Sequence, residues 1–113
     1  MDNCVFCKID KGEIPSPKVY EDEKFFIIKD IEPKAELHYL AIPHHHFKLL
    51  SEMTEQDKKD LSYIMSTIAH LAEKLGLKGG YRLVINQGED AGQTVHHLHI
   101  HILGGQTLEF PHF

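Results

Sequence analysis

The chain has 113 residues, of which 42% are hydrophobic, and this predicts one globular domain spanning residues 1–113. The formal net charge is −5 and the Lys and Arg residues form no cluster, which disfavours a nucleic-acid-binding surface. No run approaches the roughly 18 apolar residues of a membrane span, and the N-terminus lacks a basic-then-apolar secretory pattern, so we expect a cytoplasmic protein with no membrane partner.

The first half of the chain predicts a short helix followed by strands. A short helix or turn is expected over residues 4–12, and the segment containing Pro15 and Pro17 ends it. Apolar residues between turn segments then predict three strands, at residues 19–21, 25–29 and 38–43.

The clearest helix is expected from about Thr54 to Leu75. Thr54 is a suitable N-cap, and Asp57 three residues later completes a variant of the capping box. Gly76 is a suitable stop. An apolar stripe at helical spacing, which we expect to pack against the core, is formed by Leu61, Ile64, Met65, Ile68, Leu71, Ala72 and Leu75.

Two more strands are expected after this helix, over residues 81–86 and 98–103, with a glycine-containing loop at 88–92 between them. Strands on both sides of one long helix favour an α+β fold. We therefore predict a five-stranded antiparallel sheet with one long helix and a short N-terminal helix.

The segment His97-Leu98-His99-Ile100-His101-Ile102-Leu103 alternates polar and apolar residues with the period of a half-buried strand. This predicts that the three imidazoles share one face and that the alternate apolar residues enter the core. Imidazole can act as a nucleophile, general acid or metal ligand near neutral pH, so this face is a candidate site. One metal ion held by all three histidines is disfavoured, because the first and third would lie about 13 Å apart on a flat strand.

A donor-rich loop, residues 86–94, runs directly into this segment. Its glycines allow backbone N–H groups to turn toward an anion, and Asn86, Gln93 and Thr94 add neutral donors. An ordinary hairpin loop is the alternative. The position of the loop immediately before His97 favours a phosphate-binding role.

The His97–Leu103 segment resembles the His-φ-His-φ-His-φ-φ signature of the histidine triad (HIT) superfamily, where φ is apolar. Three flanking segments resemble its Hint branch: Ile42-Pro43 ahead of His46, Gly92-Gln93-Thr94-Val95, and Gly104-Gly105. The likeness extends over residues 4–105. It implies a nucleotide hydrolase or transferase that cleaves nucleoside 5′-phosphoramidates, for example adenosine 5′-phosphoramidate to AMP, through a nucleotidyl-histidine intermediate and with no catalytic metal.

The resemblance also implies roles for individual residues. His99 would be the nucleophile, with His97 and His101 beside it in the catalytic triad. Phosphoryl oxygens would be bound by Asn86, His101 and the loop residues Gly92, Gln93 and Thr94. Asp30 would bind the ribose hydroxyls, and apolar residues including Phe6 and Ile28 would enclose a purine base. A homodimer is implied as well, formed by the long helices and the strands at 81–86.

The pair in Cys4-Val5-Phe6-Cys7 can supply two ligands to a tetrahedral Zn²⁺, which needs two more. Similarity to bacterial Hint-like proteins implies that His46 and His97 complete the site, and a Cys₂His₂ site without an open position would be structural. Two small buried hydrophobic residues and a redox pair are the alternatives for the cysteines. In zinc-free relatives, the two histidines instead join a hydrogen-bond network behind the nucleophile, and the sequence does not choose between these arrangements.

Other histidines receive no functional role. Solvated positions are expected for His44, His45, His70 and His112, and the orientations of His38 and His96 are left open. Phe110-Pro111 stands where eukaryotic Hint proteins carry Trp-Pro, so C-terminal residues are expected to shape access of the leaving group.

Three other functions compete with the phosphoramidase. A dinucleoside polyphosphate hydrolase is a related enzyme, although such proteins usually lack the Cys-x-x-Cys pair and the Gly-Gly ending. A metal-dependent hydrolase would use the three histidines as ligands. A non-catalytic nucleotide-binding module would use the same pocket for regulation.

Overall fold

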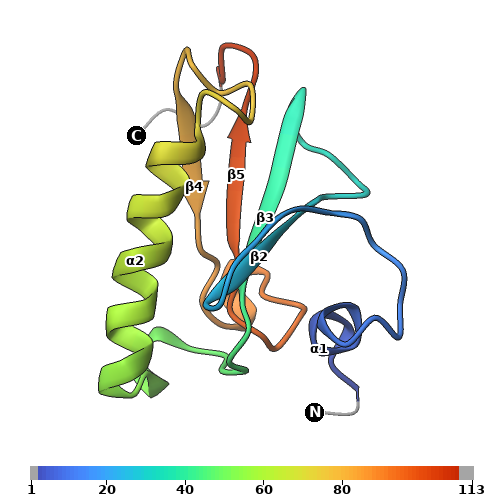
Figure 1. Ribbon diagram of the computed structural model, residues 1–113, viewed down its shortest axis with the longest axis vertical. Helices are drawn as coiled ribbons and strands as arrows, with labels where there is room; N and C mark the ends of the chain where they lie inside the picture. Colours follow the sequence, from blue (N-terminus) through green and yellow to red (C-terminus); the bar gives the residue numbers. More distant parts are fainter. Residues whose placement is uncertain (1–2, 110–113) are drawn as a thin grey trace.

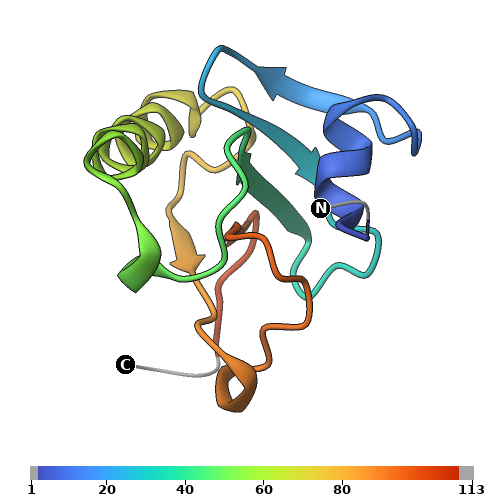
Figure 2. The same cartoon turned by 90° about the horizontal axis from the view of Figure 1, so that it is seen from below.

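The computed structural model describes residues 3–109, which form one antiparallel sheet with the two helices on its opposite faces (Figures 1 and 2). The strand order is β1-β2-β3-β5-β4, and every neighbouring pair is antiparallel. The predicted α+β architecture is therefore confirmed. The elements are α1 (Val5–Asp10), β1 (Lys18–Glu21), β2 (Phe25–Lys29), β3 (Leu37–Pro43), α2 (Glu55–Leu71), β4 (Tyr81–Val84) and β5 (Ile100–Gly104), with 3-10 turns at Leu50–Glu52 and Glu89–Ala91.

The sheet separates two apolar clusters because successive residues of a strand point to opposite faces. In β2, Phe25 and Ile27 pack with Ile64 and Ile68 of α2 on one face. Phe26 and Ile28, the alternate residues of the same strand, belong to the cluster on the α1 side. That second cluster contains Phe6, Ile9, Phe26, Ile28, Leu40 and Ile42. The cluster on the α1 side is the one that borders the candidate site.

Helix α2 begins as predicted and ends earlier than predicted. The Thr54 side chain accepts a hydrogen bond from the Asp57 N–H, and the Asp57 carboxylate accepts one from the Thr54 N–H, so the capping box is present. The last helical residue is Leu71, and the chain then turns until Gly76, whose φ of 82° favours glycine. Most of the apolar stripe faces the core, but Met65 is 40% exposed. No helix in residues 3–109 is both long enough and apolar enough to cross a membrane.

Strand β5 begins at Ile100, so the predicted strand over 98–103 starts too early. The Leu98 N–H donates to the Phe47 carbonyl at 2.6 Å, which ties this residue to the segment after β3 and not to a neighbouring strand. Leu98, Ile100 and Ile102 are fully buried, as the alternation predicted. The histidines between them lie on the α1 side of the sheet, as predicted, although His97 and His99 precede the regular strand. The ring of Phe6 contacts both His97 and His99, and the rings of His99 and His101 are 5.0 Å apart.

Candidate active site and adjoining metal-ligand cluster

The three triad histidines have three different environments. His97 is almost fully buried, and its Nε2–H donates to the Pro43 carbonyl at 2.8 Å. The Nδ1 atom of His99 lies 2.8 Å from the His97 carbonyl oxygen. The Nδ1 atom of His101 lies 2.9 Å from Nε2 of His38. Each imidazole is therefore oriented by a different neighbour.

The His99 ring is held in the form that a nucleophile requires. A carbonyl oxygen only accepts hydrogen bonds, so Nδ1 of His99 carries the proton and Nε2 keeps its lone pair in the neutral ring. Burial lowers the pKa of His99, and the bond to the His97 carbonyl partly opposes that shift. The ring also meets the edge of Phe6, with 5.0 Å between ring centroids. The imidazole is thus neutral and fixed near pH 7.

His101 lies next to His99, with 5.0 Å between the ring centroids. Burial, together with neighbouring His99 and His38, lowers its pKa to about 4. The ring is therefore uncharged near neutral pH. It can donate or accept a hydrogen bond, but it does not bring a full positive charge to the site.

These two rings line a pocket of about 350 Å³ on the α1 side of the sheet. The pocket also contains Thr94 and Asp30 as polar groups. Of the predicted nucleotide-site residues, the structure brings together Phe6, Ile28, Asp30, Thr94, His99 and His101. The pocket lining also includes Ser16, Lys29, Glu32 and Lys34. The combination of an apolar wall with carboxylate, hydroxyl and lysine side chains and two neutral imidazoles suits a small ligand with an apolar ring and a polar group.

In the glycine loop, two of the predicted phosphate ligands, Gly92 and Gln93, make hydrogen bonds to other protein groups. The Gly92 N–H donates to the Glu89 carbonyl at 2.9 Å, and the Gln93 N–H donates to the Gly88 carbonyl at 3.0 Å. The buried Gln93 side chain accepts from the Gly88 N–H and donates to the Lys48 carbonyl. These groups close the loop on itself, and neither residue lines the pocket. Asn86 also lies outside its lining, which leaves Thr94 as the loop residue at the site.

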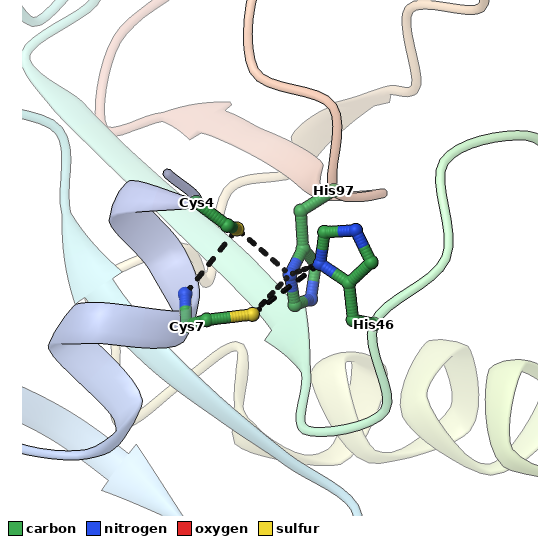
Figure 3. A group of neighbouring side chains, drawn as sticks. All are labelled: Cys4, Cys7, His46 and His97. Atoms are coloured by element: carbon green, nitrogen blue, oxygen red, sulfur yellow. Dashed lines mark hydrogen bonds between the residues drawn. The ribbon is translucent and has the colours of Figure 1, made fainter. Parts of the chain in front are cut away.

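A second cluster unites Cys4, Cys7, His46 and His97, whose ligand atoms all lie within 4.8 Å of one another. Figure 3 shows both sulfur atoms pointing from the α1 segment toward the two imidazoles. The Nδ1 atoms of the two histidines are 3.1 Å apart. The sulfur-to-nitrogen distances are 3.4 Å from Cys4 to His97, 3.3 Å from Cys7 to His46 and 3.6 Å from Cys7 to His97.

This geometry fits a tetrahedral zinc ion. Zn–N bonds of about 2.0–2.1 Å and Zn–S bonds of about 2.3 Å in a regular tetrahedron place nitrogen–nitrogen and sulfur–nitrogen pairs about 3.3–3.6 Å apart. The bond from His97 Nε2–H to the Pro43 carbonyl leaves Nδ1 free to act as the ligand atom. Metal-bound histidines commonly donate their other ring N–H to a carbonyl in this way. Burial, followed by the neighbouring Cys4, raises the pKa of Cys7 to about 11, so metal binding must displace its proton.

Solvated positions were expected for four of the remaining histidines, but two of them, His44 and His45, contact other protein groups. His44 lies between Asp10, with its Nδ1 atom 2.9 Å from a carboxylate oxygen, and the Asp22 carbonyl, 2.8 Å from Nε2. The exposed His45 ring approaches the buried Asp57 carboxylate at 2.6 Å. His70 is exposed on α2, as expected. His112 and the Phe110-Pro111 pair lie outside the described residues.

Sequence reasoning left the orientation of His38 open, and the structure places this residue behind the site. Its side chain is buried and contacts His101. Its place in the strand over residues 38–43 was predicted, but its position opposite Leu103 of β5 was not evident, because strand register depends on contacts between distant segments.

Comparison with known proteins agrees with this fold. Residues 3–109 match the family described as scavenger mRNA decapping enzyme C-term binding. The chain belongs to the histidine triad superfamily, as its His97–Leu103 motif predicted. It is 45% identical over 104 residues to Protein HitA of Neisseria gonorrhoeae, a match that covers 92% of this chain and 97% of HitA.

Solved structures give the same result. A HIT family hydrolase from Legionella pneumophila Philadelphia 1 is 41% identical and superposes with a TM-score of 0.89, covering 96% of this chain and 98% of that chain. A zinc-bound histidine triad family protein from Mycobacterium smegmatis is 34% identical with a TM-score of 0.81, covering 99% of this chain and 81% of that chain.

Proposed function

We propose that this protein is a nucleotide hydrolase or transferase that cleaves nucleoside 5′-phosphoramidates through a covalent intermediate on His99. The observation that carries this proposal is the hydrogen bond from His99 Nδ1–H to the His97 carbonyl, because it leaves Nε2 unprotonated on a ring that lines the pocket. The naming of the Legionella relative as a hydrolase supports the same reaction class.

In the first step, the lone pair of His99 Nε2 forms a bond to the α-phosphorus. The bond from phosphorus to the substrate amine breaks, and its electron pair leaves with the amine, which takes up a proton. In the second step, water attacks the phosphorus and loses a proton while the bond to Nε2 breaks. These steps release the nucleoside monophosphate and regenerate the neutral imidazole.

The other pocket residues would bind the substrate around this atom. The Thr94 hydroxyl and His101 can donate to phosphoryl oxygens, whose charge is stabilised best by donors already in place. The Asp30 carboxylate accepts from the Glu32 N–H through one oxygen and can accept from ribose hydroxyls. Phe6 and Ile28 give the apolar wall against which a purine base would pack.

We also propose that Cys4, Cys7, His46 and His97 bind a structural zinc ion. When bound, the ion supplies a cross-link between α1, the segment after β3 and the segment before β5. His97 would then be both a ligand and the residue whose carbonyl orients His99. The zinc-bound relative from Mycobacterium smegmatis supports a metal-binding role within this superfamily.

The proposed assembly is a homodimer. β4 is an outer strand of the sheet, with β5 on its paired side, so its other side can accept a strand. Tyr63 and Met65 are exposed on α2. Light scattering on the purified protein would test this assembly through its mass in solution.

The test of function is AMP release from adenosine 5′-phosphoramidate, measured for the wild type, His99→Ala and the control His70→Ala, which changes an exposed residue of α2. We expect turnover by the wild type and the control after brief exposure to EDTA, and none by His99→Ala. Mass spectrometry of a rapidly quenched reaction should detect the nucleotidylated chain. Turnover by His99→Ala would refute the mechanism, whereas AMP binding without wild-type turnover would favour the nucleotide-binding module. Faster cleavage of a dinucleoside polyphosphate would favour the related hydrolase.

A further inference from the structure

Asp30, His38 and His101 form a third group of potential ligand atoms, at the side of the pocket away from the cysteines. Nε2 of His38 lies 2.9 Å from Nδ1 of His101 and 3.4 Å from a carboxylate oxygen of Asp30. His38 is 5% exposed, so its two ring nitrogens depend on these protein partners. The spacing permits either a metal site or a chain of hydrogen bonds.

The main chain of Lys34 decides between the two. Its N–H donates to Nδ1 of His38 at 3.0 Å. A backbone amide can only donate, so Nδ1 of His38 bears no proton, and the neutral ring carries its proton on Nε2. A metal ion would need the lone pair of that same Nε2. The group is therefore suited to a hydrogen-bond chain and unsuited to a metal.

The direction of the chain follows from this protonation. The Nε2–H of His38 donates to Nδ1 of His101, so Nδ1 of His101 is an acceptor. The proton of the neutral His101 ring is then on Nε2. The pKa values support an uncharged pair, because burial lowers the pKa of His38 and lowers that of His101 to about 4. Charged or titratable groups that act on His101 are His99, His38, Asp30 and Lys34.

We propose that His38 is a positioning residue that holds His101 as the Nε2–H form, so that His101 donates a hydrogen bond to a phosphoryl oxygen of the bound nucleotide. This inference rests on the proposed function, since it names the contribution of His101 to that reaction. His38 itself does not touch the substrate. The Lys34 N–H, in the exposed loop before β3, fixes the start of the chain.

The two neighbouring imidazoles of the pocket thereby receive opposite protonation. His99 donates through Nδ1 to a carbonyl and offers a bare Nε2, as a nucleophile must. His101 accepts through Nδ1 from another histidine and offers an Nε2–H, as an oxyanion donor must. Identical side chains two residues apart thus take different roles because their Nδ1 atoms face an acceptor in one case and a donor in the other.

The first experiment reads the protonation directly. Long-range ¹H–¹⁵N correlation spectra of ¹⁵N-histidine-labelled protein distinguish protonated from unprotonated ring nitrogens. We expect His101 to carry its proton on Nε2 in the wild type and to become a mixture of both forms in His38→Leu. His38→Gln keeps an N–H donor on its side chain and should restore much of the wild-type pattern.

A second pair of variants avoids any change in the buried residue. Lys34→Pro removes the N–H that fixes His38, whereas Lys34→Ala keeps that N–H and removes only the charged side chain. We expect the proline variant to mix the protonation forms of His101 and the alanine variant to leave them unchanged. Because Lys34 lies in an exposed loop, neither change removes core contacts.

Turnover of adenosine 5′-phosphoramidate gives the functional readout. For His38→Leu and Lys34→Pro, we expect kcat to fall by about 10–100-fold with little change in KM, less than the roughly 100–1,000-fold lost when an oxyanion donor is removed outright. A wild-type proton on Nδ1 of His101, or unchanged spectra and kcat in both variants, would overturn the proposal. The spectra need no substrate, so an inactive wild type would count against the proposed reaction and leave the role of His38 to be decided by the spectra.

Discussion

Protonation of His101 should make the stability of this fold depend on pH. The pKa of this histidine is about 4 in the folded chain, mainly because of burial, against 6.5 for an unperturbed histidine. Between these values the unfolded chain binds a proton that the folded chain does not. The free energy of unfolding therefore has its full value above pH 6.5 and decreases as the pH falls toward 4.

The size of the effect follows from the difference between the two pKa values. The interval from 6.5 to about 4 corresponds to about 3 kcal/mol at ~1.4 kcal/mol per pH unit. The His101 ring is only partly buried, so solvent screening reduces this figure. We expect His101 to account for a loss of about 1–2 kcal/mol between pH 7.5 and pH 4.5.

Urea denaturation at pH 7.5, 6.0 and 4.5 would measure this loss in the wild type and in His101→Gln, which cannot titrate. EDTA in every sample prevents metal release from contributing. His46 and His97 have lowered pKa values in both proteins and make no hydrogen bond or ring contact with His101, so their contributions cancel in the comparison. His38 and His99 contact His101, so any change in their protonation is part of the measured difference. The exposed control His70→Gln should retain the wild-type pH dependence. Parallel pH profiles for the wild type and His101→Gln, within about 0.5 kcal/mol, would refute the reasoning.

Three further predictions concern the fold and the metal site. A Cβ at Gly104 would lie 2.5 Å from the Leu77 side chain and 3.0 Å from a backbone oxygen, so Gly104→Ala should lower the free energy of unfolding by about 1–3 kcal/mol. The control Gly79→Ala places its Cβ in open space and should leave the free energy of unfolding unchanged. Equal denaturation midpoints for the two variants would contradict this prediction. Thr54→Ala removes the capping-box hydroxyl of α2 and should lower the free energy of unfolding by about 1 kcal/mol in the same assay. Unchanged hydrogen exchange at the start of α2 in this variant would contradict the prediction. Cys7→Ala should abolish stoichiometric zinc measured by elemental analysis and should remove the rise in Tm that zinc gives the wild type; full zinc content in this variant would exclude Cys7 as a ligand.

The element types were predictable because each has a strong local cause. The capping box at Thr54, the apolar stripe after it and the alternation around Ile100 depend on neighbours in sequence. The residues at which these elements begin or end were not all predictable. The α2 helix ends at Leu71 and β5 begins only at Ile100, because turns and contacts with distant segments replace the regular bonds at those points.

The candidate site was also predictable only in part. The motif identified His99 and His101, but their opposite protonation depends on the His97 carbonyl and on His38, which no local pattern reveals. The phosphate-binding role expected for the glycine and amide residues of the loop stays a prediction. The Gln93 side chain bonds to the loop itself and to the Lys48 carbonyl, because a buried amide must satisfy both of its polar atoms.

The three successive histidines that follow β3 each contact a different part of the molecule. His44 contacts the end of α1 and the β1–β2 turn, His45 contacts the first turn of α2, and His46 joins the cysteine cluster. These three contacts fix the number of residues in the segment. Inserting a single residue after Pro43 would displace all three rings at once, whereas most surface loops tolerate such an insertion. Neither evolution nor engineering can therefore change the length of this connection without disturbing these contacts.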